Sequence, residues 1–368
     1  MSIEEFIEEW DNGESYVNVQ TSGSTGRPKP MQAEKQRMAA SARITCQFLG
    51  LKEGDSALLC LPLDYIAGKM MVVRALTCGL QLYATEPSSH PLKAAPSLVE
   101  KSRPPMKKSR PFLKKSRPPI KKSRPRSEKS RADFFMGDLD FAAMVPMQVW
   151  NSLQVPEERA SLQAIRHLII GGGAIDDALA RELKDFPNAV WSTYGMTETL
   201  SHIALRRLSG PDATDWYTPF EGVSLSLSDD GCLVIDAPEV CAERLVTNDL
   251  AELRPDGRFR ILGRRDNVVC SGGIKIQMEE VERLLRPHLS VLFCATKVPD
   301  QQLGEALVLL VEGMKQDSLT ALCEQVLPRL WRPRHIASVS HVPTTETGKI
   351  ARQQAQELAS RGDLNLLK

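Results

Sequence analysis

The chain lacks the features of a membrane or secreted protein. Its 368 residues contain no uncharged apolar run close to the ~18 residues that a membrane-spanning helix requires. The N-terminal stretch Met-Ser-Ile-Glu-Glu-Phe-Ile-Glu-Glu is acidic, whereas a secretory signal begins basic and continues apolar. We therefore expect a cytoplasmic protein without a membrane span. A homo-oligomer is compatible with the sequence.

Cysteine and histidine are present but are not spaced as metal ligands. The eight cysteines include no C-x-x-C pair, and the six histidines form no H-E-x-x-H or similar cluster. A zinc site is therefore not expected. In a chain of this length without an export signal, we expect reduced and mostly buried thiols.

Charge is distributed unevenly. The net charge is +1, but residues 101–131 carry fourteen Lys or Arg and one acid, Glu128, which makes that segment +13 and the remainder −12. The segment repeats Lys-Ser-Arg every seven residues and contains many prolines, which break helices. It predicts an extended or disordered insertion in a surface loop, because long loops cost little stability. The alternative is a polyanion-binding segment, although with only Phe112 as an aromatic, specific nucleic-acid binding is not expected.

Outside this insertion, apolar strands alternate with helical patterns. Strands are predicted at 16–20, 57–61, 141–145, 167–170 and 190–193, and helices at 31–49, 69–77, 148–153 and from 176. This order predicts an α/β fold, with a large N-terminal domain of mixed, largely parallel sheets over 1–263. Shorter strands follow residue 209, and residues 264–368 predict a small, mobile α+β C-terminal domain.

Segments that suit ligand binding follow several predicted strands. The Gly/Ser/Thr loop at 21–29 contains a lysine and suits polyphosphate binding, with a flexible polar turn as the alternative. It is not a Walker A loop. Glycines at 171–173 end another predicted strand. They suit either a tight turn or a stretch of backbone against which a flat ring can lie. In the segment 194–199, Tyr194 could stack on a base and Glu198 could bind Mg²⁺. The alternative is a helix start capped by Thr197.

Further candidates lie toward the C-terminus. Asp249 follows a strand in Thr247-Asn248-Asp249, where it suits a ribose diol, although the tripeptide alone is an ordinary turn. Residues 263–266 and 271–273 suit either a hinge or a solvated linker. Lys349 precedes a predicted helix, and a solvated surface lysine is the ordinary expectation for such a residue.

In order and spacing, these segments resemble the adenylate-forming superfamily, which includes acyl-CoA synthetases, luciferases and peptide-synthetase adenylation domains. The resemblance spans about residues 17–352 without the basic repeat. Residues 61–68, 144–150 and 263–282 are most similar to the o-succinylbenzoate–CoA ligases of menaquinone synthesis. The resemblance implies an AMP-forming acid–CoA ligase that uses ATP, Mg²⁺ and coenzyme A on a small aryl carboxylic acid. A ligase for another aryl or short acyl acid is the alternative.

The resemblance also implies roles for individual residues in the N-terminal domain. The loop that clasps the β- and γ-phosphates would comprise Thr21, Ser22, Gly23, Ser24, Thr25, Gly26 and Lys29. Adenine would be held by Gly171, Gly172, Gly173 and Tyr194. Thr197 and Glu198 would position phosphate and Mg²⁺. Candidates for the second carboxylate of the acid are Arg74, Lys69 and His202, with Arg74 preferred and Gly195 beside the substrate. A surface helix position is the alternative for Arg74.

The remaining implied roles concern the domain boundary and the C-terminal domain. Asp249 would bind the ribose with Arg264 nearby, and Asp266 would be the hinge. The coenzyme A approach would be lined by Ser271, Gly272 and Gly273. Lys349 would stabilise the adenylation transition state. The chain departs from the superfamily at Asn248, where glycine is usual, at Asp64-Tyr65, where an aromatic–histidine pair is usual, and in the short stretch before residue 21.

Overall fold

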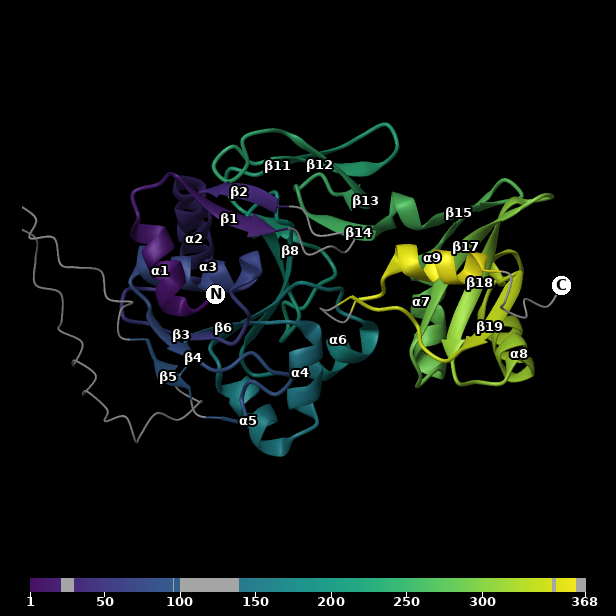
Figure 1. Ribbon diagram of the computed structural model, residues 1–368, viewed down its shortest axis with the longest axis horizontal. Coiled ribbons are helices and arrows are strands. Elements are labelled where there is room, and N and C mark those ends of the chain that lie inside the picture. Colours follow the sequence, from purple (N-terminus) through teal and green to yellow (C-terminus); the bar gives the residue numbers. More distant parts are fainter. Residues whose placement is uncertain (21–29, 95, 100–138, 346–348, 362–368) are drawn as a thin grey trace, which may run out of the picture.

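The computed structural model describes residues 1–20, 30–94, 96–99, 139–345 and 349–361. The predicted phosphate loop and basic repeat lie outside these ranges. Figure 1 shows a larger body that holds the N-terminus and a smaller body formed by the last third of the chain. None of the described helices combines the length and apolar character needed to cross a membrane.

The larger body is built on an eight-stranded sheet in the order β10-β9-β8-β7-β6-β3-β4-β5. Strands β4, β3, β6, β7 and β8 are mutually parallel. At the edges, β5 pairs antiparallel with β4, β9 with β8, and β10 with β9. The strands are β3 (Ser56–Leu59), β4 (Gln81–Ala84), β5 (Ser97–Leu98), β6 (Phe141–Met144), β7 (His167–Ile170), β8 (Ala189–Gly195), β9 (His202–Arg207) and β10 (Thr218–Pro219). The α/β class and the largely parallel sheet are thus confirmed.

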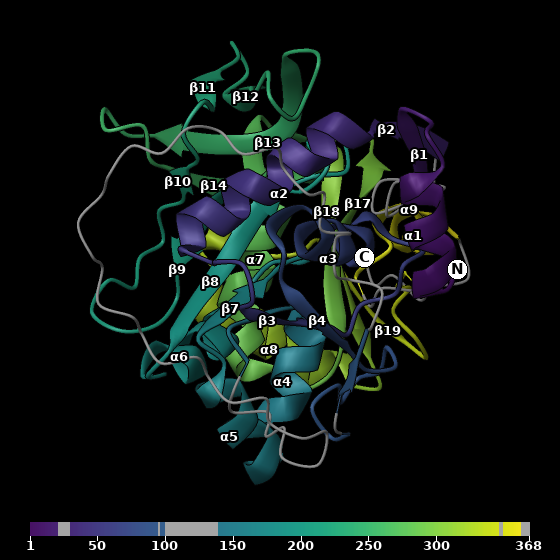
Figure 2. The ribbon, with the colours of Figure 1, turned by 90° about the vertical axis from the view of Figure 1, so that its left-hand side faces the viewer.

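Helices cover both faces of this sheet, as Figure 2 shows. In β3 every residue is buried, and successive side chains point to opposite faces. Leu59 joins one core with α1–α3, whereas Leu58 joins another with α4–α6. The helices are α1 (Ile3–Asp11), α2 (Lys35–Leu49), α3 (Ile66–Cys78), α4 (Pro146–Leu153), α5 (Pro156–Ala164) and α6 (Asp177–Lys184).

The predicted helix at 31–49 is wrong at its start. Residues 30–34 form β2 (Pro30–Glu34), which pairs antiparallel with β1 (Tyr16–Gln20). Local sequence pattern did not reveal this strand because its partner lies on the other side of the predicted phosphate loop. The helix α2 then ends at Gly50, whose φ of +65° gives the left-handed turn that favours glycine.

A four-stranded antiparallel sheet, β11-β12-β13-β14, joins the larger body to the smaller one. Its strands are β11 (Ser224–Leu227), β12 (Cys232–Asp236), β13 (Leu245–Leu253) and β14 (Phe259–Arg264). A short 3₁₀ helix, η3 (Arg265–Asn267), follows β14 directly. At these residues the chain passes from this sheet to the smaller body.

The smaller body has its own sheet and two apolar cores. Its strands are β15 (Val268–Ser271), β16 (Ile274–Gln277), β17 (Phe293–Asp300), β18 (Gly304–Glu312) and β19 (His335–Val339), and its helices are α7 (Met278–Leu285), α8 (Gln316–Val326) and α9 (Arg352–Ser360), with 3₁₀ turns η4 (Arg286–His288) and η5 (Arg329–Trp331). Along β18, Leu309 faces the core with α7 and α8, and Leu310 faces the core with α9.

Candidate active site

The parallel strands β7 and β8 end side by side, and both predicted binding segments begin there. The amide of Gly171 donates to the Met144 carbonyl at 3.0 Å, which holds the glycine segment against β6. A Cβ on Gly171 would lie 2.5 Å from Oγ1 of Thr193. Glycine at 171 is therefore required for the close approach of this segment to β8, at the sheet edge where α/β folds bind ligands.

The segment after β8 is a tight connection to β9 and not a helix. Thr199 Oγ1 lies 3.0 Å from the Met196 amide and 2.7 Å from the Ser201 carbonyl. Leu200 takes a φ of +63°. A Cβ on Gly195 would lie 2.2 Å from the Ser201 oxygen. The alternative in which Thr197 caps a helix is wrong, because the chain reverses into an antiparallel strand.

Tyr194, predicted for adenine, forms one hydrogen-bonded chain with the predicted ribose residues Asp249 and Arg264. The Tyr194 hydroxyl donates to Asp249 at 2.7 Å, and Arg264 donates to the other Asp249 oxygen at 3.0 Å. Arg264 also reaches Asp266 at 3.3 Å. Burial, with the Asp249 charge beside it, raises the pKa of Tyr194 above its ordinary value, so the hydroxyl stays a donor. The network joins β8, β13, β14 and the predicted hinge.

Asn248 contributes to the same network. Its amide nitrogen donates to Asp266 at 3.0 Å, and its oxygen accepts from Arg265 at 2.9 Å. Glycine at this position would make neither contact. The departure from the superfamily pattern therefore adds two side-chain contacts to the predicted hinge.

Arg74 is a buried cation without a carboxylate partner among the described residues. It lies on α3 with 2% of its surface exposed, so the surface alternative is wrong. One nitrogen donates to Ser201 at 2.8 Å, whereas the buried Nε has no partner in the described chain. Burial lowers the pKa of Arg74 to about 10, which leaves it charged at neutral pH. Such a group attracts an anion.

His202 extends this polar cluster beneath the connection from β8 to β9. Its Nδ1 lies 3.1 Å from the Ser201 hydroxyl, and its Nε2 lies 3.2 Å from Oγ1 of Thr45 on α2. Burial, with the Arg74 charge beside it, lowers the pKa of His202 well below its ordinary value. The imidazole is therefore neutral, so Arg74 supplies the positive charge of this cluster.

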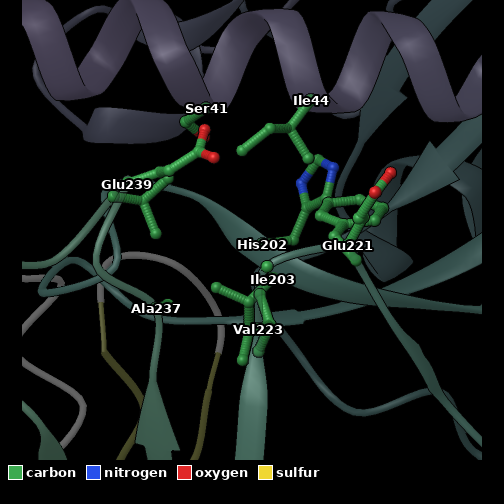
Figure 3. Close-up of a pocket in the computed structure, with 11 residues that line it drawn as sticks. Ser41, Ile44, His202, Ile203, Glu221, Val223, Ala237 and Glu239 are labelled. Carbon is green, nitrogen blue, oxygen red and sulfur yellow. The ribbon is translucent and has the colours of Figure 1, made fainter.

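Two neighbouring features are less suited to a second carboxylate. Lys69 lies against α1, with its ammonium 3.8 Å from Glu9 and over the Phe6 ring. Figure 3 shows a pocket between α2 and the start of β9, with Glu221 and Glu239 among its lining residues. Both carboxylates are exposed and would repel an anionic acid. Arg74 therefore remains the best candidate.

Lys349 lies in the smaller body, directly before α9. Its carbonyl accepts from the Thr345 amide at 2.7 Å, and Thr344 pairs with Ile350. The side chain is partly buried, and burial lowers the pKa of the ammonium, unlike that of a solvated surface lysine. In Figure 1 the start of α9 lies on the side nearest the larger body.

The start of α9 is held by a buried ion pair. Arg352 donates to both oxygens of Glu282 at 2.6 and 2.7 Å and to the Ala295 carbonyl at 2.8 Å. Glu282 lies on α7 with 8% of its side chain exposed. These contacts fix the backbone three residues after Lys349.

The predicted coenzyme A residues form the turn between β15 and β16. Ser271 pairs with Ile274, and Gly272 and Gly273 have φ values of +57° and +84°. The Gly272 amide donates to the Leu303 carbonyl at 2.8 Å. The segment is therefore an anchored hairpin turn and not a solvated linker.

The donor set beside β8 fits a cation shared with phosphate. Glu198 is exposed in the connection, next to the buried Thr197. Among the described residues, no three His, Cys, Asp or Glu side chains cluster as a complete metal site. Mg²⁺ commonly binds through one or two carboxylates with phosphate and water oxygens completing the shell, and a single Glu198 suits that arrangement.

Comparison with known proteins identifies the family. Residues 7–239 match the AMP-binding enzyme family. The chain belongs to this family. A solved acyl-CoA synthetase (AMP-forming)/AMP-acid ligase II-like protein from Dyadobacter fermentans is 31% identical, with a TM-score of 0.58, and the match covers 97% of this chain and 93% of that one.

More distant relatives carry a narrower description. The 2-succinylbenzoate–CoA ligase of Listeria monocytogenes is 23% identical over 97% of this chain and 73% of its own length. That of Salmonella typhimurium is 27% identical over 85% of this chain and 61% of its own length. O-succinylbenzoate coenzyme A synthetase from Bacillus subtilis, in complex with ATP and magnesium ion, has the same fold, with a TM-score of 0.67 at 21% identity over 92% and 69% of the two chains.

Sequence reasoning about this AMP-binding enzyme missed several residues that the fold brings to the site. Ser201 bridges Arg74 and His202, and Thr45 holds the other side of the imidazole. Neither has a local signal, because a serine in a turn and a threonine in a helix are ordinary. The predicted phosphate-loop residues, Thr21 to Gly26 and Lys29, fall outside the described part of the chain.

Proposed function

We propose that this AMP-binding enzyme is an acid–CoA ligase that activates o-succinylbenzoate with ATP and then forms the coenzyme A thioester. Relatives described as 2-succinylbenzoate–CoA ligases support this substrate. The observation that carries the proposal is the buried Arg74, whose charge has no carboxylate partner in the described chain. An acid with two carboxylates can place one against Arg74 and leave the other to react.

The reaction takes two steps. The reacting carboxylate attacks the α-phosphorus of ATP, which yields the acyl-adenylate and pyrophosphate. The thiol of coenzyme A then attacks the acyl carbon and displaces AMP. A carboxylate is a poor electrophile, so the enzyme contributes chiefly by orienting the partners and stabilising charge that develops on phosphorus.

Residues from three strands would hold the nucleotide. Asp249, fixed by Tyr194 and Arg264, would accept from the ribose hydroxyls. Residues 171–173, which run close against β8, would let a flat base approach the backbone. Glu198 would hold Mg²⁺, which neutralises phosphate charge when bound. The predicted loop at 21–29 would complete the phosphate site.

The smaller body, residues 264–368, would act as a lid that turns about Asp266. Lys349 is a compact point charge, and its partly buried ammonium would stabilise the adenylation transition state when the lid is closed one way. A second orientation would bring the turn at Ser271, Gly272 and Gly273 to the site for the thioester step.

Thioester formation with a panel of acids tests the proposal. With ATP, Mg²⁺ and coenzyme A, we expect o-succinylbenzoate to be used with a higher kcat/KM than benzoate or short aliphatic acids. Equal kcat/KM values for monocarboxylic acids would favour the alternative, a ligase for another aryl or short acyl acid. Absence of AMP release with every acid would refute the ligase activity.

A further inference from the structure

Two thiols that the proposed reaction does not use lie together between α2 and α3. Cys46 is 4% exposed on α2, and Cys78, the last residue of α3, is partly buried against the same apolar core. The two thiols lie close enough to shift each other's pKa. The Cys78 thiol also lies 3.8 Å from the Ala42 carbonyl. Side chains on a helix point toward the preceding turn, so the Cys46 side chain lies over the turn that contains Ala42. The two sulfurs therefore lie close together.

The surroundings activate one member of the pair. The neighbouring Cys46 thiol, followed by the positive charges of Arg74 and Arg43, lowers the pKa of Cys78. The neighbouring Cys78 thiol, with burial, raises the pKa of Cys46. Arg74 lies one helical turn before Cys78 on α3. A partly accessible, lowered-pKa thiol beside a buried second thiol is the arrangement of a reactive cysteine and its resolving partner.

We propose that Cys46 and Cys78 form a reversible disulfide that joins α2 to α3, by exchange with a small disulfide such as glutathione disulfide. The Cys78 thiolate attacks one sulfur of the reagent and releases one glutathione thiolate. The Cys46 thiol then loses its proton and attacks the Cys78 sulfur of the mixed disulfide, releasing the second glutathione thiolate. Two electrons and two protons pass from the protein to glutathione.

The bond would form directly behind the Arg74 cluster. Thr45, next to Cys46, holds His202, and Arg74, one turn before Cys78, holds Ser201. A covalent link would fix the spacing of α2 and α3 beside Thr45 and Arg74. We therefore expect oxidation to change the KM for the acid and to leave the KM for ATP unchanged. This second effect rests on the proposed function, whereas the disulfide itself does not.

Peptide mapping of the whole protein tests the disulfide. The protein is equilibrated at increasing ratios of oxidised to reduced glutathione, quenched with acid, alkylated and digested with trypsin. We expect a cross-linked pair of peptides, 44–52 and 75–93, lacking two hydrogens and both alkyl groups. The pair should disappear in Cys46→Ser and Cys78→Ser. It should persist in Cys60→Ser, which removes a buried thiol that bonds the Ala143 carbonyl.

The exposed Cys270 serves as an internal control for the reagent. Full alkylation of Cys46 and Cys78 at a ratio that converts Cys270 to its glutathione adduct would overturn the proposal. A complete disulfide with an unchanged KM for the acid would overturn the coupling to the Arg74 cluster. Lack of thioester formation in both redox states would refute the proposed function and leave the cross-linked peptide as independent evidence for the disulfide.

Discussion

Replacing Arg74 with methionine should make the protein more stable and a worse enzyme at the same time. The buried guanidinium donates to the Ser201 hydroxyl at 2.8 Å and lies 3.7 Å from the Met71 sulfur, whereas its Nε has no partner in the described chain. A buried unsatisfied donor costs about 1–3 kcal/mol. Methionine removes that cost and fills most of the space. The lost contact with the Phe141 ring, at 6.0 Å, offsets about 0.5–1 kcal/mol of the gain.

These two terms leave an expected gain for Arg74→Met of about 0–2.5 kcal/mol in the free energy of unfolding without substrates. In the same variant, the acid loses a charged partner, which costs about 2–5 kcal/mol. At about 1.4 kcal/mol for each tenfold change, kcat/KM for o-succinylbenzoate should fall roughly 30-fold or more. Urea unfolding and steady-state thioester formation measure the two effects.

Lys69→Met is the matched control, because it removes a buried cation from the same helix. Lys69 has a carboxylate partner, Glu9, at 3.8 Å. Its removal leaves that carboxylate partly buried and unpaired, so the free energy of unfolding should fall while kcat/KM changes little. The reasoning is refuted if Arg74→Met lowers the urea midpoint and leaves kcat/KM for the diacid unchanged.

Four further predictions concern the rest of the chain. Lys349→Ala should abolish adenylate formation and spare thioester formation from preformed acyl-adenylate; equal loss in both half-reactions would contradict a moving lid. Arg352→Met should lower the free energy of unfolding, measured with urea, by about 3 kcal/mol, because it leaves Glu282 unpaired. Adding Glu282→Gln should recover much of that loss. Burial lowers the pKa of His167 to about 4. Between pH 6.5 and 4 the unfolded chain therefore binds more protons than the folded chain. The free energy of unfolding should fall as the pH is lowered through this interval, and less steeply in His167→Gln. Deleting residues 101–131 should leave kcat/KM unchanged if the repeat is a tolerated insertion, and salt-sensitive retention on DNA that the deletion removes would support the polyanion-binding alternative.

Local sequence pattern was sufficient to predict an element where the residues of that element alone show a clear periodicity. The buried strand β7 and the helix from residue 176 were both predicted, because a continuous apolar run and a helical pattern are local signals. In the structure Asp176 caps this helix, accepting from the Leu179 amide at 2.8 Å. Pattern failed at β2, where residues 30–34 look helical until β1 pairs with them.

The candidate site shows the same division. Residue types and their order pointed to Tyr194, Asp249 and Arg264 separately, and the fold joins them into one network. Ser201 and Thr45 carried no signal, because their roles depend on partners distant in sequence. The role of Asn248 also emerged only from its contacts with Asp266 and Arg265 at the predicted hinge.

The sequence by itself determined the family pattern and the α/β class, because composition, periodicity and motif spacing are properties of the chain. Only the tertiary structure decided that Arg74 is buried without a carboxylate partner among the described residues, that Lys69 is paired with Glu9 of α1, and that two thiols 32 positions apart lie close together. Burial and charge pairing depend on distances between segments, and those distances exist only once the chain has folded.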